Sequence, residues 1–192
     1  MNTKFPLRPL AAAAAAALLA LAACSGGEDE AGGSDTAEPS DATLVQAISQ
    51  ADQLSTVAGA LGDTGLSQVF DGAGAYTIFA PNDEAFAKLG DAGEGLSDPE
   101  QRAVMAAILR DHIVPGYLTP ADIEAAINSK GGAVVVETMG NHLLRFTRDD
   151  DGLRVTGEDG SSASVAGSAV KASNGVAMPI DGLLKKLDAA PA

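Results

Sequence analysis

The single cysteine of the chain, Cys24, separates a leader from the part that is able to fold. Lys4 and Arg8 come first, and residues 10–20 that follow are all alanine or leucine. This apolar run is shorter than the roughly 20 residues that a membrane-spanning helix needs. The pattern predicts a secretory signal peptide over residues 1–23, so the fold has to be built from the residues after it.

The residues immediately before Cys24 favour attachment of lipid to this side chain. Leu21–Cys24 reads LAAC, which resembles a bacterial lipobox, where small or apolar residues precede the cysteine that becomes the mature N-terminus. A bacterial lipoprotein carries several acyl chains, which together hold a protein firmly at a membrane. The alternative is an ordinary signal peptide that is cleaved near Ala23 and releases a soluble protein. Ser25 replaces the aspartate typical of inner-membrane retention, and the choice between inner and outer membrane stays open.

The segment 24–41 is acidic and poor in large apolar residues. It contains Glu28, Asp29, Glu30, Asp35, Glu38 and Asp41 and no basic residue. Such a segment buries too little apolar surface to offset the entropy lost on ordering, so we expect a flexible tether with a reach of roughly 25 Å. The remaining chain then divides into this tether, a folded domain at 42–188 and a short tail at 189–192.

The charge of the chain argues against one class of partner. Removal of residues 1–23 takes Lys4 and Arg8 from the 12 basic residues and leaves 10 against 26 acidic ones, a balance near −16. This charge repels the phosphates of nucleic acids and anionic lipid headgroups, so we expect no nucleic-acid binding. Because there is no second cysteine, no intramolecular disulfide forms, and the roughly 150 residues of the domain depend on their apolar core.

Apolar residues at helical spacing dominate the first half of the domain. Leu54, Val57, Ala58 and Leu61, for example, recur at positions i, i+3, i+4 and i+7. We expect short helices at 44–48, 54–61 and 66–70, a buried strand at 76–80, a helix capped by Asn82, a helix opened by Ser97–Glu100 that ends at Pro115, and a helix opened by Thr119. The helix before Pro115 carries one apolar stripe, formed by Val104, Met105, Ile108, Leu109, His112 and Ile113.

Strand-like runs separated by turn residues dominate the second half. We expect strands at 133–136, 142–147, 153–156, 162–165, 170–172 and 176–180. The dipeptides at 151–152 (DG) and 174–175 (NG) are turn signals, and the second is expected to place Gly175 at a positive φ. Helices followed by a strand-rich half predict an α+β fold with mainly antiparallel pairing.

Three blocks of the sequence resemble the signatures of the fasciclin-like domain. Tyr76–Phe86 reads YTIFAPNDEAF, Leu109–Gly116 reads LRDHIVPG, and Ala172–Leu184 reads ASNGVAMPIDGLL. The resemblance extends over about residues 41–188. It implies a wedge of two small, mainly antiparallel β-sheets with several short helices packed at one side.

The chain departs from the family pattern at two places that are implicated in adhesion in animal relatives. The tyrosine that usually precedes the histidine is Asp111 here, and Ala169-Val170 stands where animal relatives have an Asp-Ile pair. Both features are implicated in integrin adhesion in those relatives, so it stays open whether that type of adhesion survives. Asp111 and His112 are nevertheless the candidate partner-binding residues. The alternative for His112, which its apolar stripe favours, is a hydrogen-bonded histidine in the core.

No pattern in the sequence indicates catalysis, a metal or a cofactor. Two histidines and one lipidated cysteine cannot assemble a zinc cluster from nitrogen and sulfur ligands. The acidic run 149–152 lacks the alternating ligands of a calcium loop, and no Gly-x-Ser-x-Gly elbow occurs. Asp83 and Glu84 are explained by the dipole at the start of a helix.

These observations predict a non-enzymatic lipoprotein of the cell envelope. We expect it to be exported, attached to membrane lipid through acylated Cys24, and to face the periplasm or the cell exterior. The expected role is adhesion or binding of an envelope or extracellular protein or glycan. The alternative is a surface lipoprotein that captures a small ligand between its helices and sheets. The identity of the partner and the oligomeric state stay open.

Overall fold

The computed structural model describes residues 41–72, 74–96, 98–150 and 152–187, which belong to one compact unit. The predicted signal peptide, Cys24, the tether up to residue 40 and the tail at 189–192 lie outside the described residues. In the described part of the chain, no helix has the length and apolar character needed to cross a membrane.

The helices fall mainly in the first half of the domain, as expected. They are α1 (Leu44–Ser49), α2 (Ser55–Asp63), the 3-10 helix η1 (Leu66–Asp71), α3 (Asp83–Ala87), α4 (Asp91–Gly95), the 3-10 helix η2 (Pro99–Gln101), α5 (Arg102–Asp111) and α6 (Pro120–Lys130). The strands are β1 (Tyr76–Pro81), β2 (Ile113–Pro115), β3 (Val134–Glu137), β4 (Leu143–Asp149), β5 (Gly152–Gly157), β6 (Ser162–Ser164), β7 (Val170–Ala172) and β8 (Gly175–Ile180).

The strands form two four-stranded sheets. The first has the order β2-β1-β8-β7, and the second has the order β3-β4-β5-β6. All neighbours are antiparallel except β1 and β8, which run parallel in a register that sets Tyr76 opposite Gly175 and Pro81 opposite Ile180. The expected α+β fold with two small, mainly antiparallel sheets and several short helices is confirmed.

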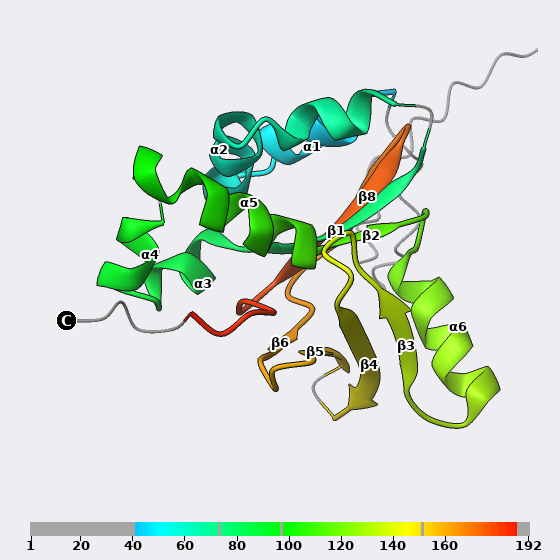
Figure 1. Cartoon of the computed structure of the whole chain (residues 1–192). Coiled ribbons are helices and arrows are strands. Elements are labelled where there is room, and N and C mark those ends of the chain that lie inside the picture. The colour runs from blue at the N-terminus through cyan, green and yellow to red at the C-terminus, as the bar shows by residue number, and fades with distance from the viewer. Residues whose placement is uncertain (1–40, 73, 97, 151, 188–192) are drawn as a thin grey trace, which may run out of the picture. The chain divides into compact units, whose positions relative to one another are not determined.

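The first sheet lies between two apolar cores. Ile78 and Ala80 of β1 pack with α1, α2 and α5 in one core, whereas Phe79 belongs to the other core, shared with the second sheet. Phe79 meets Phe146 of β4 at a ring-centroid distance of 5.0 Å. Strands β1 and β8 are therefore buried on both faces, which explains why they read as continuous apolar runs. Figure 1 shows α1, α2 and α5 on one side of β1 and β8.

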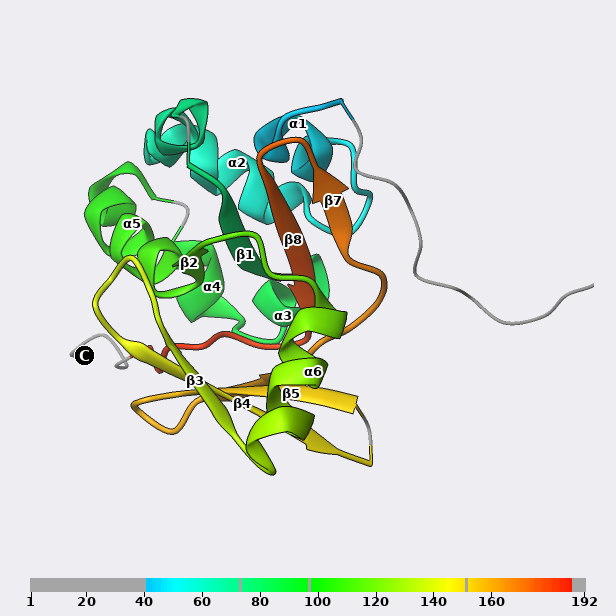
Figure 2. The ribbon, with the colours of Figure 1, turned by 90° about the vertical axis from the view of Figure 1, so that its right-hand side faces the viewer.

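The second sheet has one buried and one exposed face. Strands β4 and β5 alternate between buried and more exposed residues along their length, as a half-solvated antiparallel sheet requires. Helix α6 packs against β3 and β4 and contributes Ile123 and Ile127 to the core shared with the first sheet (Figure 2). The start of this helix follows the sequence closely, because Thr119 and Asp122 form a reciprocal capping box.

The segment before Pro115 differs from the single helix that was expected. Its first turn is the 3-10 helix η2, α5 ends at Asp111, and Ile113–Pro115 forms the edge strand β2 beside β1. The unpaired edge of β1 supplies the hydrogen-bond partners that draw these residues out of the helix. Val104 does not join the core with the rest of its stripe, since 45% of its surface is exposed.

The turn at Asn174 and Gly175 forms as expected, but the glycine is needed for a different reason. The φ of Gly175 is not positive. A Cβ at this position would overlap the carbonyl oxygen of Tyr76 on the neighbouring strand and crowd the side chain of Leu44. The amide of Asn174 accepts a hydrogen bond from Leu44 N at 2.7 Å and donates one to Phe70 O at 2.6 Å. The dipeptide thus fastens α1 and η1 to the β7–β8 turn.

Candidate binding site at the end of helix α5

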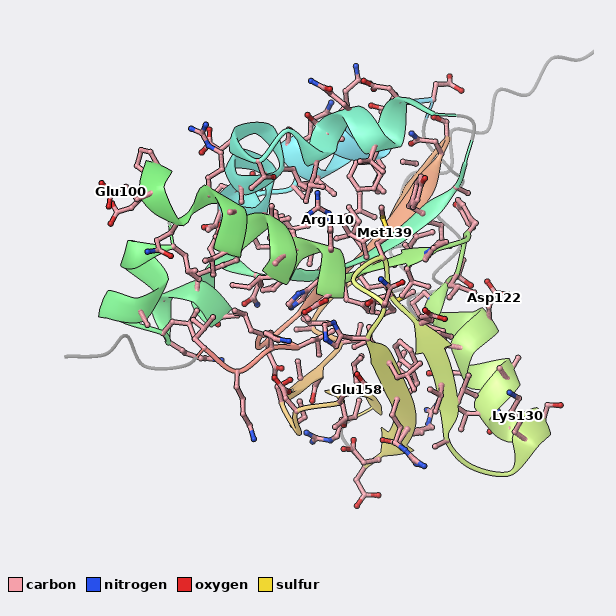
Figure 3. The ribbon with its side chains drawn as sticks, in the orientation of Figure 1. Glu100, Arg110, Asp122, Lys130, Met139 and Glu158 are labelled. Carbon is pink, nitrogen blue, oxygen red and sulfur yellow. The ribbon has the colours of Figure 1, made fainter. Side chains whose placement is uncertain are left out.

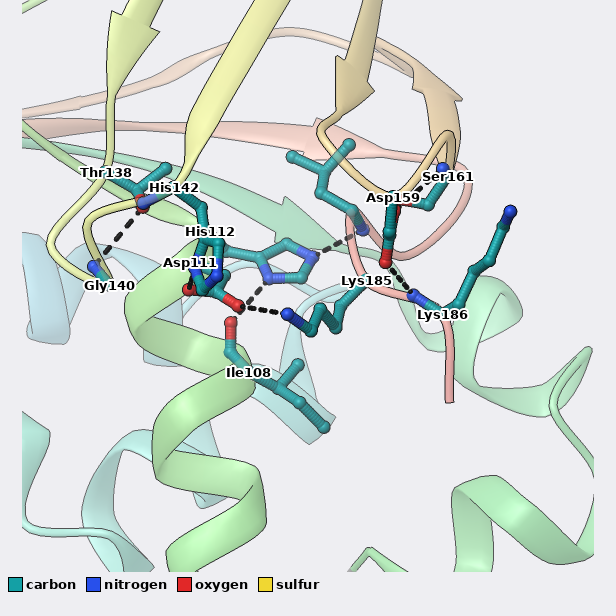
Figure 4. Close-up of polar contacts among 11 residues, drawn as sticks. Ile108, Asp111, His112, Thr138, Gly140, His142, Asp159, Ser161, Lys185 and Lys186 are labelled. Carbon is teal, nitrogen blue, oxygen red and sulfur yellow. Dashed lines mark hydrogen bonds and ion pairs between the residues drawn. The ribbon is translucent and has the colours of Figure 1, made fainter. Parts of the chain in front are cut away.

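A buried carboxylate joins three parts of the chain at the end of α5. Asp111 is 5% exposed and contacts His142 Nδ1 at 2.7 Å and Lys185 Nζ at 3.4 Å (Figure 4). His142 belongs to the β3–β4 turn (residues 138–142), and Lys185 belongs to the C-terminal segment (residues 181–187) that follows β8. A buried charge is tolerated only when it is paired and hydrogen-bonded, so these contacts hold the three parts together.

The β3–β4 turn is shaped to approach this carboxylate. The hydroxyl oxygen of Thr138 accepts hydrogen bonds from the backbone N–H groups of Gly140 and His142, each at 3.2 Å. Gly140 lies so close to Asp111 that a Cβ there would overlap the carboxylate oxygen Oδ1. The N–H of Gly140 also donates to Arg110 O at 3.2 Å. Only glycine at position 140 permits this contact between turn and helix.

His112 ties the C-terminal segment to α5 from inside the core. It is fully buried, its Nδ1 lies 2.7 Å from Ile108 O, and Leu184 N donates to its Nε2 at 2.9 Å. This network assigns the neutral tautomer with the proton on Nδ1. Burial lowers the pKa of His112 to about 4, although the Ile108 carbonyl and the charges of Asp111 and Asp159 act in the opposite direction.

Asp159 fixes the same segment from the other side. Its carboxylate accepts hydrogen bonds from Ser161 N at 2.9 Å and from Lys186 N at 2.6 Å. Burial acts to raise the pKa of Asp159, but the hydrogen bonds from Ser161 and Lys186 and the charge of Lys185 outweigh it and lower the pKa to about 2. His112 therefore holds Leu184, Asp111 holds Lys185, and Asp159 holds Lys186.

A cavity of about 830 Å³ lies along α5 next to this polar cluster, between the helix, the β3–β4 turn and the C-terminal segment. We name it the α5 groove. Asp111 and His142 lie in its wall at one end, and Val104 and Ile108 form part of its floor. Arg110 and Met139, both labelled in Figure 3, also line it.

The two predicted partner-binding residues lie at this site but point inward. Asp111 is almost fully buried and His112 is completely buried, in the hydrogen-bonded core position that its apolar stripe favours. His142, whose side chain is 44% exposed, is the accessible member of the cluster. Sequence reasoning missed His142 and Lys185 as partners of Asp111, since long-range contacts bring them together. The Lys185-Lys186 pair, unusual in so acidic a chain, is a signal that could have drawn attention to this segment.

The acidic pair at the start of α3 serves the fold. Asp83 accepts hydrogen bonds from Ser55 Oγ at 2.8 Å and Thr56 N at 2.9 Å, and so caps the neighbouring helix α2. Burial acts to raise the pKa of Asp83, but these hydrogen bonds from Thr56 and Ser55 outweigh it and keep the pKa below its usual value. Across the described residues, no group of three or more His, Cys, Asp or Glu side chains is placed to hold a metal ion.

Comparison with known proteins identifies the family. The family model of the fasciclin domain matches residues 52–186. Protein sll1483 of Synechocystis sp. is 31% identical over 150 residues, which cover 77% of this chain and 76% of that protein. The chain therefore belongs to the fasciclin domain family, whose members are typically extracellular or secreted and generally non-enzymatic.

The fold matches a solved structure of this family. A FAS1 domain pair from the insect cell adhesion molecule fasciclin I superposes with a TM-score of 0.66 at 16% sequence identity. The alignment covers 76% of this chain and 51% of the insect chain. At this identity the likeness concerns the fold, and it agrees with the architecture implied by the three sequence blocks.

Proposed function

We propose that this protein is a non-enzymatic adhesion or recognition module, anchored by lipid at the cell envelope. The observation that carries the proposal is the fasciclin domain over residues 52–186, a domain type also found as a pair in a cell adhesion molecule. Acylated Cys24 supplies the anchor, and the acidic tether sets the domain roughly 25 Å from the membrane surface.

The charge of the domain suggests the kind of surface that it recognises. With 10 basic against 26 acidic residues after removal of residues 1–23, the anchored protein favours partners that are basic or coated with cations. The exposed imidazole of His142 and the rim of the α5 groove stand around the buried Asp111–His112 pair. We assign partner contact to this rim, with an envelope or extracellular protein or glycan as the partner.

Cross-linking and affinity capture on intact cells of the native host test this proposal. We expect the anchored protein to capture the same envelope protein or glycan reproducibly, and the Cys24→Ser form to lose it. If no partner is recovered in several growth states, the recognition function is wrong.

The α5 groove favours capture of a small ligand as a second candidate function. Its volume of about 830 Å³ falls within the range typical of ligand sites, and it combines apolar and charged side chains. Native mass spectrometry of the protein purified from its own host tests this role. A compound that remains bound in a one-to-one ratio supports ligand capture, whereas a mass that corresponds to the acylated chain from Cys24 alone contradicts it.

A further inference from the structure

The floor of the α5 groove is apolar and exposed. Val104 is 45% exposed, and only Val135 and Leu143 are comparable among the large apolar side chains of the described residues. Met139 of the β3–β4 turn and Leu187 of the C-terminal segment face the same cavity. An apolar surface gathered in a concave site is a common place for a ligand to bind.

The shape of the groove fits a linear molecule. Its floor follows one face of α5 from Gln101, just before the helix, through Val104 to Asp111 at its end. A ten-residue helix is about 15 Å long, so the floor accommodates an extended alkyl chain of medium length.

The charge at one end of the groove is opposite to that of the chain. Arg110 and Lys185 line it there, although the whole chain has only 12 basic residues against 26 acidic ones. Lys186 also lines the groove, but its side chain turns away toward the β5–β6 turn, where its Nζ lies beside Gly160 (Figure 4). Asp111, the acid at this end, is already paired with His142 and Lys185. Among the ion pairs of the described residues, none involves Arg110. Its guanidinium group is thus available to an anionic group.

We infer that the α5 groove binds a single-chain amphipathic carboxylate of the fatty-acid class. The alkyl chain lies along Val104 and Ile108, and the carboxylate lies at the end that holds Arg110. This inference names the ligand for the second candidate function and rests on it. Its failure would leave the adhesion proposal untouched, because adhesion requires a macromolecular partner and not this ligand.

Calorimetric titration of the full-length Cys24→Ser chain with dodecanoate, below its micelle concentration, tests the inference. We expect one dodecanoate per chain. Dodecyltrimethylammonium, which has the same alkyl chain with a positive headgroup, should bind at least tenfold more weakly. Absence of dodecanoate binding, equal binding of the two amphiphiles, or preference for an acidic peptide over dodecanoate would each overturn the inference.

Two matched valines locate the site. Val104→Asp places a carboxylate on the groove floor and should weaken dodecanoate binding at least tenfold, because the alkyl chain would then bury a charge. Val135→Asp is the control, since Val135 is 46% exposed on β3 and does not line the groove. Arg110→Gln should reduce the preference for dodecanoate over dodecyltrimethylammonium while the melting temperature stays near that of the parent. If the two valine variants bind dodecanoate with equal affinity, or if Arg110→Gln keeps the headgroup preference of the parent, the ligand binds elsewhere and the inference is wrong.

Discussion

At the scale of single residues, His112 of the family motif is buried and serves the fold through hydrogen bonds. Both ring nitrogens are used, one toward Ile108 O and the other by Leu184 N–H. Protonation would set an N–H group at Nε2 against the N–H of Leu184, so the fold requires the neutral ring. The stability of the domain is therefore linked to the titration of this one side chain.

This linkage predicts a loss of stability in mild acid. The pKa of His112 falls from 6.5 in the unfolded chain to about 4 in the fold, so the unfolded state binds more protons between these values. The contribution is complete above pH 6.5 and lost progressively down to pH 4, by about 3 kcal/mol. Urea unfolding across this range measures it.

A His112→Gln variant is the control for this pH dependence. It should be less stable than the parent at neutral pH and should lack the decline that His112 causes. Asp83, Asp122 and Asp159 have lowered pKa values, so their contributions disappear only as the pH falls below the usual aspartate value of 3.8. A variant with the same slope as the parent between pH 6.5 and 4 would show that His112 does not carry the effect.

Gly175 gives a second prediction at this scale. Gly175→Ala should lower the free energy of unfolding by about 2–3 kcal/mol, because the new methyl group meets the Tyr76 carbonyl and the Leu44 side chain. Gly59→Ala is the matched control. Gly59 lies within α2, and a Cβ added there would have open space around it, so alanine at this position should stabilise the domain by about 0.5–1 kcal/mol. Chemical denaturation that ranks both variants alike would refute the close-approach argument.

At the scale of elements, Asp83 links two helices. It sits in the first turn of α3, yet its carboxylate caps α2, whose own N-cap residue Leu54 has no capping side chain. Asp83→Ala should lower the free energy of unfolding by about 1–2 kcal/mol. Glu84→Ala, a change of the adjacent exposed acid, should have an effect of less than about 0.5 kcal/mol. Thermal unfolding of the two variants measures the difference. Equal losses of stability would mean that the helix dipole alone explains both acids.

Elements whose signals are local were predictable from the sequence. The capping box at Thr119 begins α6, Asn82 caps α3, and the hairpin of β4 and β5 forms around the acidic turn. The strand β2 and the exposure of Val104 were not predictable. Both depend on the positions of the β1 edge and of the C-terminal segment. The spacing of apolar residues along α5 carries no information about these positions. The parallel pairing of β1 with β8 is likewise a long-range contact.

In the candidate site, too, the features with local signals were predictable and those that depend on long-range contacts were not. The position of Asp111 and the burial of His112 followed from the apolar stripe of α5 and from the resemblance to the family. Their partners did not, because His142, Lys185 and Leu184 come from two distant parts of the chain. Gly140 had no distinguishing pattern, although its missing side chain allows the turn to reach Asp111.

At the scale of the whole molecule, the proposed function depends on attachment of the chain to the membrane through Cys24. Cys24→Ser should move the protein from the membrane fraction to the soluble fraction of the native host, because the substituted side chain cannot carry lipid. Immunoblotting of separated fractions measures this, and Ser25→Ala is the control that should stay membrane-bound. A Cys24→Ser protein that remains in the membrane fraction would contradict the lipobox interpretation.

The most direct test of the central claim is the attachment and aggregation of native-host cells that lack this protein. Deletion should reduce attachment, the wild-type chain should restore it, and the Cys24→Ser chain should not. Unchanged attachment, aggregation and surface contacts after deletion would contradict the role of this domain as a tethered adhesion module.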